Sequence, residues 1–334
     1  MKYKVIVLFD RLVPGHFLYE GLKRRHTKTL FIDNEKDDAS MCSWLKGAFR
    51  AVRHSRNSDV IVCWSDIQAV LCWWISLLLF RRCRIIAINI LLKDKNSFKN
   101  RCVSIMYKYA LRSGRTEATV SSESFAQMLN RKLKIDKSYT IMKDVYKYAE
   151  IESPFADKGR KVFVGGSNGR DWEAAFRVAA TMPDVEFSFV HTGSARYSPD
   201  AVSPNIRLYN NIPVEEFIDI QRRCSITYLP LLTEAPAGLI VMYQAAALNQ
   251  LVIMSDTITT REYITEERGC LVPMYDSDKA VERIRYYLEN INERELKSRT
   301  LKAYLRENCS ESAYVDTINR LIFKLLDINE SDLQ

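Results

Sequence analysis

The sequence contains little glycine and little proline, the two residues that most often interrupt helices and strands. Its 334 residues include 11 glycines and 9 prolines, and this composition excludes a collagen-like or low-complexity chain. Hydrophobic residues make up 47% and charged residues 27%, as in globular proteins that fold around a core. The length exceeds that of a typical single domain, so we expect two domains, each with a core of its own.

Cysteine pairs and long apolar segments are also missing. The eight cysteines form neither a C-x-x-C pair nor the Cys/His spacing of a zinc site, so we expect reduced thiols in a cytoplasmic protein. The N-terminus, MKYKVIVLFD, has too short an apolar core for a signal peptide. The apolar run AVLCWWISLLLF, residues 69–80, is well short of the roughly 20 residues that span a bilayer. It predicts a helix that is buried in a core or seated at a membrane surface.

Two phosphate-binding motifs are absent. The Walker pattern GxxxxGK[ST] occurs nowhere, which argues against a P-loop NTPase, and the first predicted turn, FDRLVPGHF, lacks G-x-G-x-x-G. Asp276-Ser277-Asp278 resembles a D-x-D metal motif. Because it directly precedes a helical segment, we expect these acids to cap that helix instead. We predict no metal site.

Negative charge is scarce in the first part of the chain. Residues 1–150 contain 28 Lys and Arg against 14 Asp and Glu, a net charge of +14, whereas the remaining 184 residues contain 21 against 27, a net charge of −6. The two halves should therefore face different partners. The basic half fits an anionic membrane surface, a phosphate-bearing substrate, nucleic acid or simply a solvated face. No nucleic-acid-binding motif accompanies this charge, so we expect no nucleic-acid partner.

Apolar strand-like runs alternate with helical segments along the whole chain, which favours βαβ units and parallel sheets. We predict an α/β fold of two Rossmann-like domains facing a cleft: 1–155 as the first, acceptor-side domain and 156–334 as the second. The last helices, within 295–326, could pack back on the first domain. The predicted strands are 4–9, 29–32, 59–64, 84–90, 117–121, 139–142, 161–164, 186–190, 206–209, 225–229, 251–254 and 270–272. The predicted helices before the tail are 17–25, 41–54, 69–80, 98–112, 123–134, 171–181, 214–223, 238–248 and 278–290.

Three of the few glycines cluster in VFVGGSNGRDW, residues 162–172. This is the first strand-to-helix turn of the second predicted domain, where ligands of open α/β sheets bind. Small residues let the backbone approach a ligand, and free helix amides with the Arg170 guanidinium would hold a phosphate or diphosphate. The alternative is a tight turn that needs a positive φ, with Arg170 paired to a nearby acid.

The second half resembles the nucleotide-sugar-binding half of GT-B glycosyltransferases, in particular the large retaining family that uses UDP- or GDP-sugars. The resemblance lies in VFVGGSNGRDWEAAFRVAATMPDVEFSFVHTG, NIRLYNNIPVEEFIDIQRRCSITYLPL, APAGLIVMYQAAALNQLVIMSDTITTREYI and RGCLVPMYDSDKAVERIRYYLEN. The order and spacing match throughout, whereas the first half matches in topology only. In that family these segments bind the diphosphate, base and ribose of the donor.

The resemblance implies a set of donor-binding residues. Arg170 matches the basic diphosphate ligand, and the preceding turn would give close backbone approach. His191 and Gly193 stand where the family has a glycine-rich turn near the nucleotide. Ala237 and Gly238 open a helix whose amides could hold the distal phosphate or the sugar. The turn residues implied in this way are Gly165, Gly166 and Ser167.

The chain departs from the family's E-x7-E signature. QAAALNQLV, residues 244–252, fits the segment after the second glutamate, with Gln244 at the Glu position and Asn249 at the Gly position; anchoring on Gly238 would select Tyr243 instead. Gln can bond a ribose diol but lacks the charge that strengthens such a bond. The first glutamate position falls on Pro236, and Glu234, two residues earlier, is the candidate catalytic residue.

Three further residues complete the implied site. His16 follows Gly15 in the first turn of the first domain, where it could act as a general base, bind the sugar or lie exposed in a loop. Glu262, beside Arg261, resembles the family's acidic residue on a loop facing the cleft; the alternative is a surface ion pair, which contributes little.

These features predict a metal-independent hexosyltransferase-like enzyme of surface polysaccharide synthesis. A UDP- or GDP-sugar would be the donor, no further cofactor is expected, and the acceptor would be a hydroxyl of a glycan or of a polyprenyl-diphosphate-linked saccharide. The protein would be cytoplasmic and peripheral on the inner, anionic membrane face. A nucleotide-sugar epimerase of the same fold and a non-catalytic sugar-nucleotide-binding scaffold remain alternatives, the latter because both signature glutamates are lost.

Overall fold

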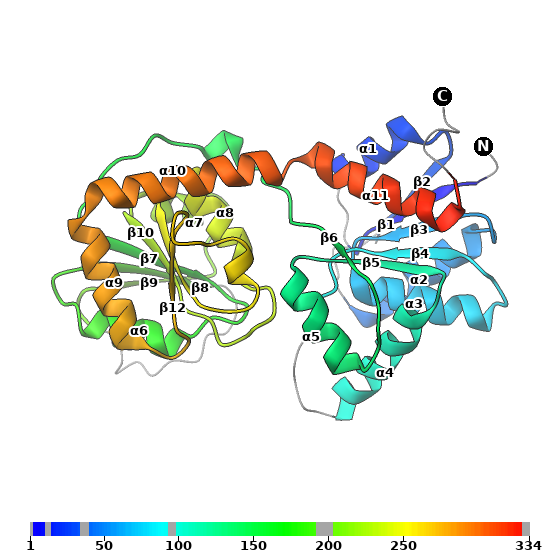
Figure 1. The fold of residues 1–334 in the computed structure, drawn as a ribbon, viewed down its shortest axis with the longest axis horizontal. Coiled ribbons are helices and arrows are strands. Elements are labelled where there is room, and N and C mark those ends of the chain that lie inside the picture. The colour runs from blue at the N-terminus through cyan, green and yellow to red at the C-terminus, as the bar shows by residue number, and fades with distance from the viewer. Residues whose placement is uncertain (1–2, 11–14, 34–39, 93–97, 192–202, 329–334) are drawn as a thin grey trace. The chain divides into compact units, whose positions relative to one another are not determined.

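The computed structural model describes residues 3–10, 15–33, 40–92, 98–191 and 203–328. The chain divides into two compact units (Figure 1). Unit 1 consists of residues 1–145 and 309–334, and unit 2 of residues 146–308. Each unit contains one six-stranded parallel sheet with helices on both faces, so the predicted α/β class with two Rossmann-like domains is confirmed.

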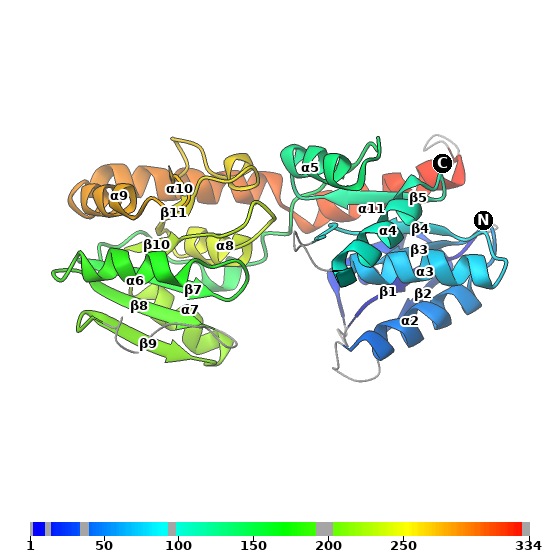
Figure 2. The same ribbon diagram turned by 90° about the horizontal axis from the view of Figure 1, so that it is seen from below.

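Unit 1 has the strand order β2-β1-β3-β4-β5-β6. Its central strands, such as VIVL and VIVC, are buried throughout, as expected for a parallel sheet covered on both faces. Helices α2 to α5 cover one face, and α1 and α11 cover the other (Figures 1 and 2). The elements are β1 (Val5–Leu8), α1 (Phe17–Arg25), β2 (Thr29–Ile32), α2 (Met41–His54), β3 (Val60–Cys63), α3 (Asp66–Leu78), β4 (Arg84–Ala87), α4 (Phe98–Arg112), β5 (Thr116–Val120), α5 (Glu123–Leu133), β6 (Thr140–Ile141) and α11 (Glu311–Leu326).

The apolar run of unit 1 forms helix α3, which packs between α2 and α4. Its central residues are buried, as the sequence predicted for a core helix, whereas Leu77 to Phe80 at its C-terminal end are exposed. No helix in the described part of the chain has the length and apolarity that crossing a membrane requires. The eight cysteines carry free thiols.

Unit 2 has the strand order β12-β11-β10-β7-β8-β9, so the direction of strand addition reverses between β7 and β10. Helices α6 and α9 pack on one face around the main core, and α7, α8 and α10 pack on the other. The elements are η1 (Ala149–Ile151), β7 (Lys161–Gly166), α6 (Trp172–Ala180), β8 (Glu186–His191), β9 (Ile206–Asn210), α7 (Val214–Arg222), β10 (Ile226–Leu229), α8 (Leu239–Ala247), β11 (Leu251–Ser255), η3 (Thr260–Glu262), β12 (Cys270–Val272), α9 (Ser277–Glu289) and α10 (Ile291–Asn308).

The units divide at Val145 and Tyr146, earlier than the expected boundary at residue 155. The reason is that the connecting segment packs on unit 2. Ser153 N donates to Ala247 O at 3.2 Å, and the Tyr146 ring lies 6.2 Å from that of Tyr243. The last helix, α11, packs against α1, β4 and β5 and so belongs to unit 1 rather than to the second domain.

Helix starts in unit 2 follow the capping pattern of the sequence. Asp276 accepts a hydrogen bond from Lys279 N at 2.8 Å and caps α9, so the predicted capping role of this D-x-D segment is confirmed. Asp171 caps α6 in the same way through Ala174 N, at 2.9 Å. One amide at the start of α6 is therefore already bonded.

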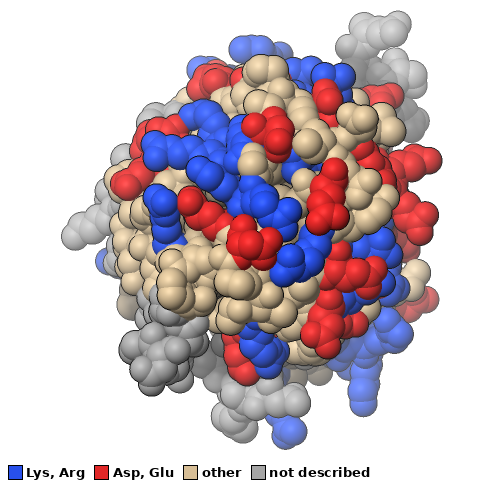
Figure 3. Space-filling model, turned by 90° about the vertical axis from the view of Figure 1, so that its left-hand side faces the viewer, with Lys and Arg blue, Asp and Glu red and all other residues tan. Residues whose placement is uncertain are grey.

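Charge is mixed at the end of unit 2 that carries α6 and α9. Figure 3 shows Lys and Arg interspersed with Asp and Glu there, and Asp184 pairs with both Arg160 and Arg285. Counted over the whole chain, unit 1 has 29 Lys and Arg against 18 Asp and Glu, a net charge of +11, and unit 2 has 20 against 23, a net charge of −3. The basic character of the chain therefore resides in unit 1.

Acid should weaken the packing of α11 on unit 1 through His26. This residue is 3% exposed, its Nδ1 lies 3.1 Å from the Tyr3 hydroxyl, and its ring is 5.8 Å from that of Phe323 on α11. Burial lowers the pKa of His26 below its usual 6.5; the nearby Asn319 side chain, as an acceptor for the protonated ring, opposes this, and the charge of Arg25 adds to it.

Because the folded chain binds the His26 proton less readily, stability is retained above pH 6.5 and falls as the pH drops through the lowered pKa. The slope is at most about 1.4 kcal/mol per pH unit for one proton. We expect the melting temperature to fall more steeply below pH 6.5 in the wild type than in His26→Gln. If the melting temperatures of the two proteins fall equally with pH, His26 is not the group responsible for the loss of stability.

Candidate functional site

The site forms where the strand order of unit 2 reverses, at the carboxyl ends of β7 and β10. The turn after β7 is fixed to the segment after β10 by two backbone hydrogen bonds. Asp171 N donates to Pro230 O at 3.0 Å, and Leu232 N donates to Gly169 O at 2.8 Å. Arg170 lies between these two hydrogen bonds, and its backbone forms an isolated antiparallel β-bridge with that of Leu231. The backbone of Arg170 is therefore fixed at the point where the strand order reverses.

The Arg170 side chain is buried and has no acidic partner among the residues that the structure describes. The residue is 5% exposed, and its Nε and Nη1 have no hydrogen-bond partner among the described residues. Burial lowers the pKa of Arg170 to about 10, so the guanidinium is still charged at neutral pH. An unpaired buried charge is costly, and an anion bound beside it would offset that cost. The alternative in which Arg170 pairs with a nearby acid is not seen among the described residues.

Two glycines with positive φ line the guanidinium. Gly166 has φ +108° and Gly238 has φ +74°. A Cβ on Gly166 would lie 2.7 Å from Arg170 Nη2, and a Cβ on Gly238 would lie 3.2 Å from Arg170 Nη1. Both positions therefore need glycine for backbone conformation and for space.

Gly238 is also the N-cap of α8, and no side chain caps this helix. The backbone amides of its first turn consequently lie beside the guanidinium, which together with the helix dipole makes the place suited to a phosphate or diphosphate. The structure thus brings together Gly166, Arg170 and Gly238, three of the predicted residues, while the start of α6 is capped by Asp171.

Gly165 is small for a different reason from the one predicted. A Cβ here would lie 2.4 Å from Phe163 Cε1 and 2.8 Å from Phe217 Cζ. The residue therefore makes room for two aromatic rings behind the strand, whereas the sequence suggested close approach to a ligand. Ser167 is exposed in the turn, and Ala237 is buried just before α8.

Gln244 lies in α8, 6% exposed, and its Oε1 has no hydrogen-bond partner among the described residues. The alignment that selects it places Asn249 at a glycine position of the family. Asn249 has φ +50°, the left-handed conformation that Gly and Asn adopt most readily, which favours this alignment. The rival, Tyr243, is buried in an aromatic group with Tyr146, Tyr148 and Tyr263.

Glu234 and Glu262 occupy loops near the ends of the strands. Glu234 is exposed, and its Oε2 accepts a hydrogen bond from Ile258 N at 2.7 Å, so the carboxylate ties two loops of unit 2 together. Glu262 is half-buried at the end of η3. The ion pair expected beside it forms instead between Arg261 and Asp256, with Nη2 and Oδ2 2.9 Å apart.

His191 ends β8 in register with Gly166 and is 4% exposed. Its ring meets that of Trp172 edge-on, with centroids 5.8 Å apart. It therefore lies in the sheet next to the site strand rather than in an exposed loop. Gly193, predicted beside it, lies outside the described residues.

In unit 1, His16 is the N-cap of α1 and is not a loop histidine. Its Nδ1 accepts a hydrogen bond from Leu18 N at 3.2 Å, and its ring packs against Phe9 and Trp64 at 4.6 and 4.5 Å. With Nδ1 as acceptor, the neutral ring carries its proton on Nε2, so His16 in this state is a donor rather than a general base. Gly15 precedes it with φ +68°.

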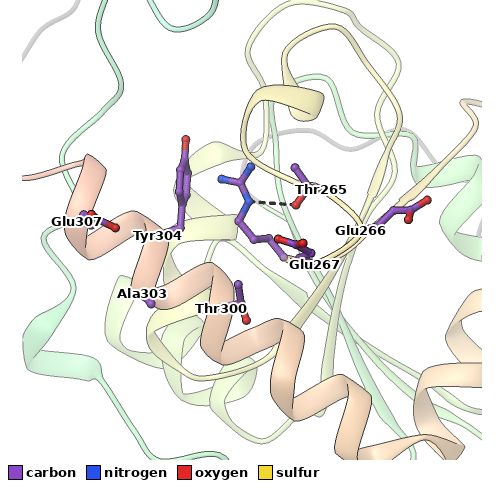
Figure 4. A pocket seen from close by; sticks show the side chains of 8 residues that line it. Thr265, Glu266, Glu267, Thr300, Ala303, Tyr304 and Glu307 are labelled. Atoms are coloured by element: carbon purple, nitrogen blue, oxygen red, sulfur yellow. Dashed lines mark hydrogen bonds between the residues drawn. The ribbon is translucent and has the colours of Figure 1, made fainter.

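A cavity of about 750 Å³ lies elsewhere in unit 2, between the segment 265–268 and α10 (Figure 4). The Arg268 guanidinium stacks over the Tyr304 ring at 3.8 Å, and its Nε donates to Thr265 Oγ1 at 3.2 Å. Glu266, Glu267 and Glu307 also line this cavity. Three carboxylates make it unsuited to a diphosphate, which favours the place beside Arg170.

The fold and the strand reversal define a GT-B architecture. Residues 201–308 match the family described as Glycosyl transferases group 1. The resemblance that the sequence suggested is therefore confirmed for residues 201–308. No curated protein sequence matches the chain.

Several solved structures share the fold over nearly the whole chain. HepE of Anabaena in complex with UDP is 11% identical with a TM-score of 0.70, covering 96% of this chain and 100% of that one. A glycosyltransferase from Rickettsia africae is 13% identical with a TM-score of 0.67, covering 98% and 100%. Sucrose-phosphate synthase from Thermosynechococcus elongatus is 14% identical with a TM-score of 0.73, covering 97% and 99%. At these identities the likeness shows the fold.

Replacing Arg170 by methionine should separate stability from binding. Methionine fills similar space without the unpaired charge, so the free protein should gain between zero and about 4 kcal/mol in unfolding free energy. Inorganic diphosphate should raise the melting temperature of the wild type and not that of Arg170→Met. Arg207→Met, at an exposed and ion-paired arginine, serves as control and should keep the diphosphate shift. A shift retained in Arg170→Met would place the anion elsewhere.

Gly166→Ala should weaken anion binding beyond its effect on stability. The left-handed backbone costs an L-residue roughly 1–2 kcal/mol, and the new Cβ would displace the guanidinium. Gly159→Ala is the matched control, because Gly159 has φ +72° in the same unit with nothing near its Cβ position. We expect similar stability losses in both variants but weaker UDP binding by calorimetry only in Gly166→Ala. Equal affinities would argue against a ligand beside Gly166.

Proposed function

We propose that the chain is a glycosyltransferase that moves a sugar from a nucleoside diphosphate sugar to an acceptor hydroxyl. The observation that carries the proposal is the guanidinium of Arg170, which is buried between Gly166 and the start of α8 and has no acidic partner in the described part of the chain. UDP-sugars are the first donors to test, because HepE, which shares the fold, was crystallised with UDP and with UDP-glucose. GDP-sugars are the alternative donors.

In the proposed reaction the acceptor oxygen bonds to the anomeric carbon while the bond from that carbon to the diphosphate breaks. Negative charge develops on the leaving diphosphate, and the acceptor hydroxyl gives up its proton to that diphosphate or to solvent. Arg170 and the first amides of α8 would stabilise that charge, taking the place of a metal cation. Gln244 would bond the ribose without charge assistance, and its unpartnered Oε1 supports this role. His191, Ala237 and Glu262 are proposed to line the donor site, and Glu234 and His16 to contact the sugar.

The proposed acceptor is a hydroxyl of a glycan or of a polyprenyl-diphosphate-linked saccharide, as in surface polysaccharide synthesis. The net charge of +11 on unit 1 supports an anionic, membrane-presented acceptor. We accordingly propose a cytoplasmic enzyme that is peripheral to the membrane.

A non-catalytic sugar-nucleotide-binding protein is the second candidate. Two observations favour it: Gln244 stands where the family has a glutamate, and the Glu234 carboxylate is already bonded to Ile258 N. Such a protein would bind a nucleotide sugar without turning it over.

The deciding measurement is UDP or GDP release from a panel of nucleotide sugars, with and without a bacterial membrane extract. We expect release that depends on the extract and that falls about 100-fold or more in Arg170→Met, since one lost donor to a developing anion costs that much. Gln244→Ala should lower donor affinity modestly, by a few-fold. Binding without release under every acceptor condition would favour the non-catalytic protein, and acceptor-independent conversion of the donor sugar would favour an epimerase.

A further inference from the structure

Helix α2 of unit 1 exposes an apolar stripe. Met41, Leu45 and Phe49 recur every four residues on one side of the helix and are 50%, 48% and 43% exposed. Cys72 Sγ of α3 lies 3.8 Å from Ala48 O, so the Ala48 side of α2 faces α3. Leu45 lies one turn before Ala48 on the same helix. The apolar stripe therefore runs beside the contact between α2 and α3, on the side that is exposed to solvent.

The apolar surface continues over α3 and α4. Trp74 of α3 is half-buried, and its ring lies 6.3 Å from that of Tyr109 on α4. Tyr109 and Ile105, one turn apart on α4, are 52% and 53% exposed. Three neighbouring helices therefore expose apolar side chains on the same helical layer (Figure 2). Contiguous exposed patches of this kind mark interaction sites.

The C-terminal end of α3 exposes a phenylalanine in a costly conformation. Phe80 is 95% exposed and has φ +52°, and the preceding Leu78 is 76% exposed. Arg81 N donates to Ser76 O at 2.8 Å and Phe80 N to Leu77 O at 3.1 Å, the hydrogen bonds of a Schellman helix end, in which the left-handed residue is usually glycine. A bulky residue kept exposed at such a position, at the expense of backbone strain, points to a function for its side chain.

Basic residues border this apolar face, and the three helices that form it contain one acidic residue. Arg81 and Arg82 follow Phe80 at the end of α3. The one acidic residue of α2, α3 and α4 is Asp66, whose carboxylate accepts hydrogen bonds from Ile67 N and Leu91 N, both at 2.8 Å. The end of unit 2 that Figure 3 shows differs in this respect, because Lys and Arg are interspersed there with Asp and Glu. The exposed or half-buried basic side chains of α2 and α4 are Lys46, Arg50, Arg53, Arg101, Lys108 and Arg112.

We propose that this face of α2, α3 and α4 seats unit 1 on an anionic lipid surface. The apolar side chains, with Phe80 as the outermost, would enter the headgroup region, and the surrounding Lys and Arg would pair with lipid phosphates. Charge complementarity favours lipid over a second copy of the chain, because a symmetric contact would place the basic border against itself. The proposal stands on this surface and is independent of the transfer reaction.

The test is co-sedimentation of the full chain with vesicles of phosphatidylcholine, with and without phosphatidylglycerol. We expect binding to the anionic vesicles that weakens as salt rises, because screening shortens the reach of the charges. Phe80→Gly should lower vesicle binding by roughly tenfold, since one large apolar side chain is lost. Its melting temperature should equal or exceed that of the wild type, because glycine suits the left-handed position.

Two further variants sharpen the test. Leu45→Ser/Phe49→Ser should also lower vesicle binding, while Leu296→Ser, which removes a 65% exposed leucine from α10 of unit 2, should not. UDP binding is measured on the same samples. Intact UDP binding with lost vesicle binding supports the surface assigned here, even if no transfer activity is found.

Three results would overturn the proposal. One is the absence of binding to anionic vesicles at low salt. Another is wild-type binding by both Phe80→Gly and Leu45→Ser/Phe49→Ser. The third is a dimer, or a retained RNA, that is lost in these same variants, because the face would then serve another partner.

Discussion

The free energy of an unpaired guanidinium in a protein interior is the constraint on which the proposed chemistry depends. Arg170 is held by backbone hydrogen bonds on both sides of its own residue, which fix its backbone between the segments that follow β7 and β10. The charge is buried in the free protein. A site of this kind binds an anion with little reorganisation, because the cost of burying the charge has already been met by the fold.

The other buried arginine in the described part of unit 2, Arg294, has an acidic partner, in contrast to Arg170. Arg294 is fully buried, yet its two terminal nitrogens donate to Tyr287 O at 3.2 Å and to Asp157. Gln250 sits in a buried network with Gln221 and Thr227, where Thr227 Oγ1 donates to Gln250 Oε1 at 2.8 Å. These groups stabilise the fold. Arg170 contributes in the opposite direction, as residues at binding sites often do.

The two units share one architecture but differ in charge and in the side chains that they expose. Unit 2 is slightly acidic, and it holds a buried guanidinium where the strand order reverses and two glycines leave space beside it. Unit 1 is basic, and its outer helical layer combines exposed apolar side chains with Lys and Arg. The proposed donor carries a diphosphate and the proposed acceptor lies at an anionic surface, so both would be negatively charged. The buried cation of unit 2 and the solvated basic face of unit 1 are complementary to these proposed partners.

The sequence alone determined the elements of the fold and several residues of the candidate site. Apolar runs and their periods placed the strands and helices, because burial of parallel strands requires continuous apolar segments, and the glycine cluster with Arg170 located the turn. Only the tertiary structure decided which residues meet. Gly165 leaves space for the rings of Phe163 and Phe217. Glu234 accepts a hydrogen bond from Ile258 N, and His16 caps α1. Gly238 reaches Arg170 because β10 pairs with β7, and a contact between residues so far apart in the chain follows from strand pairing, which local patterns do not encode.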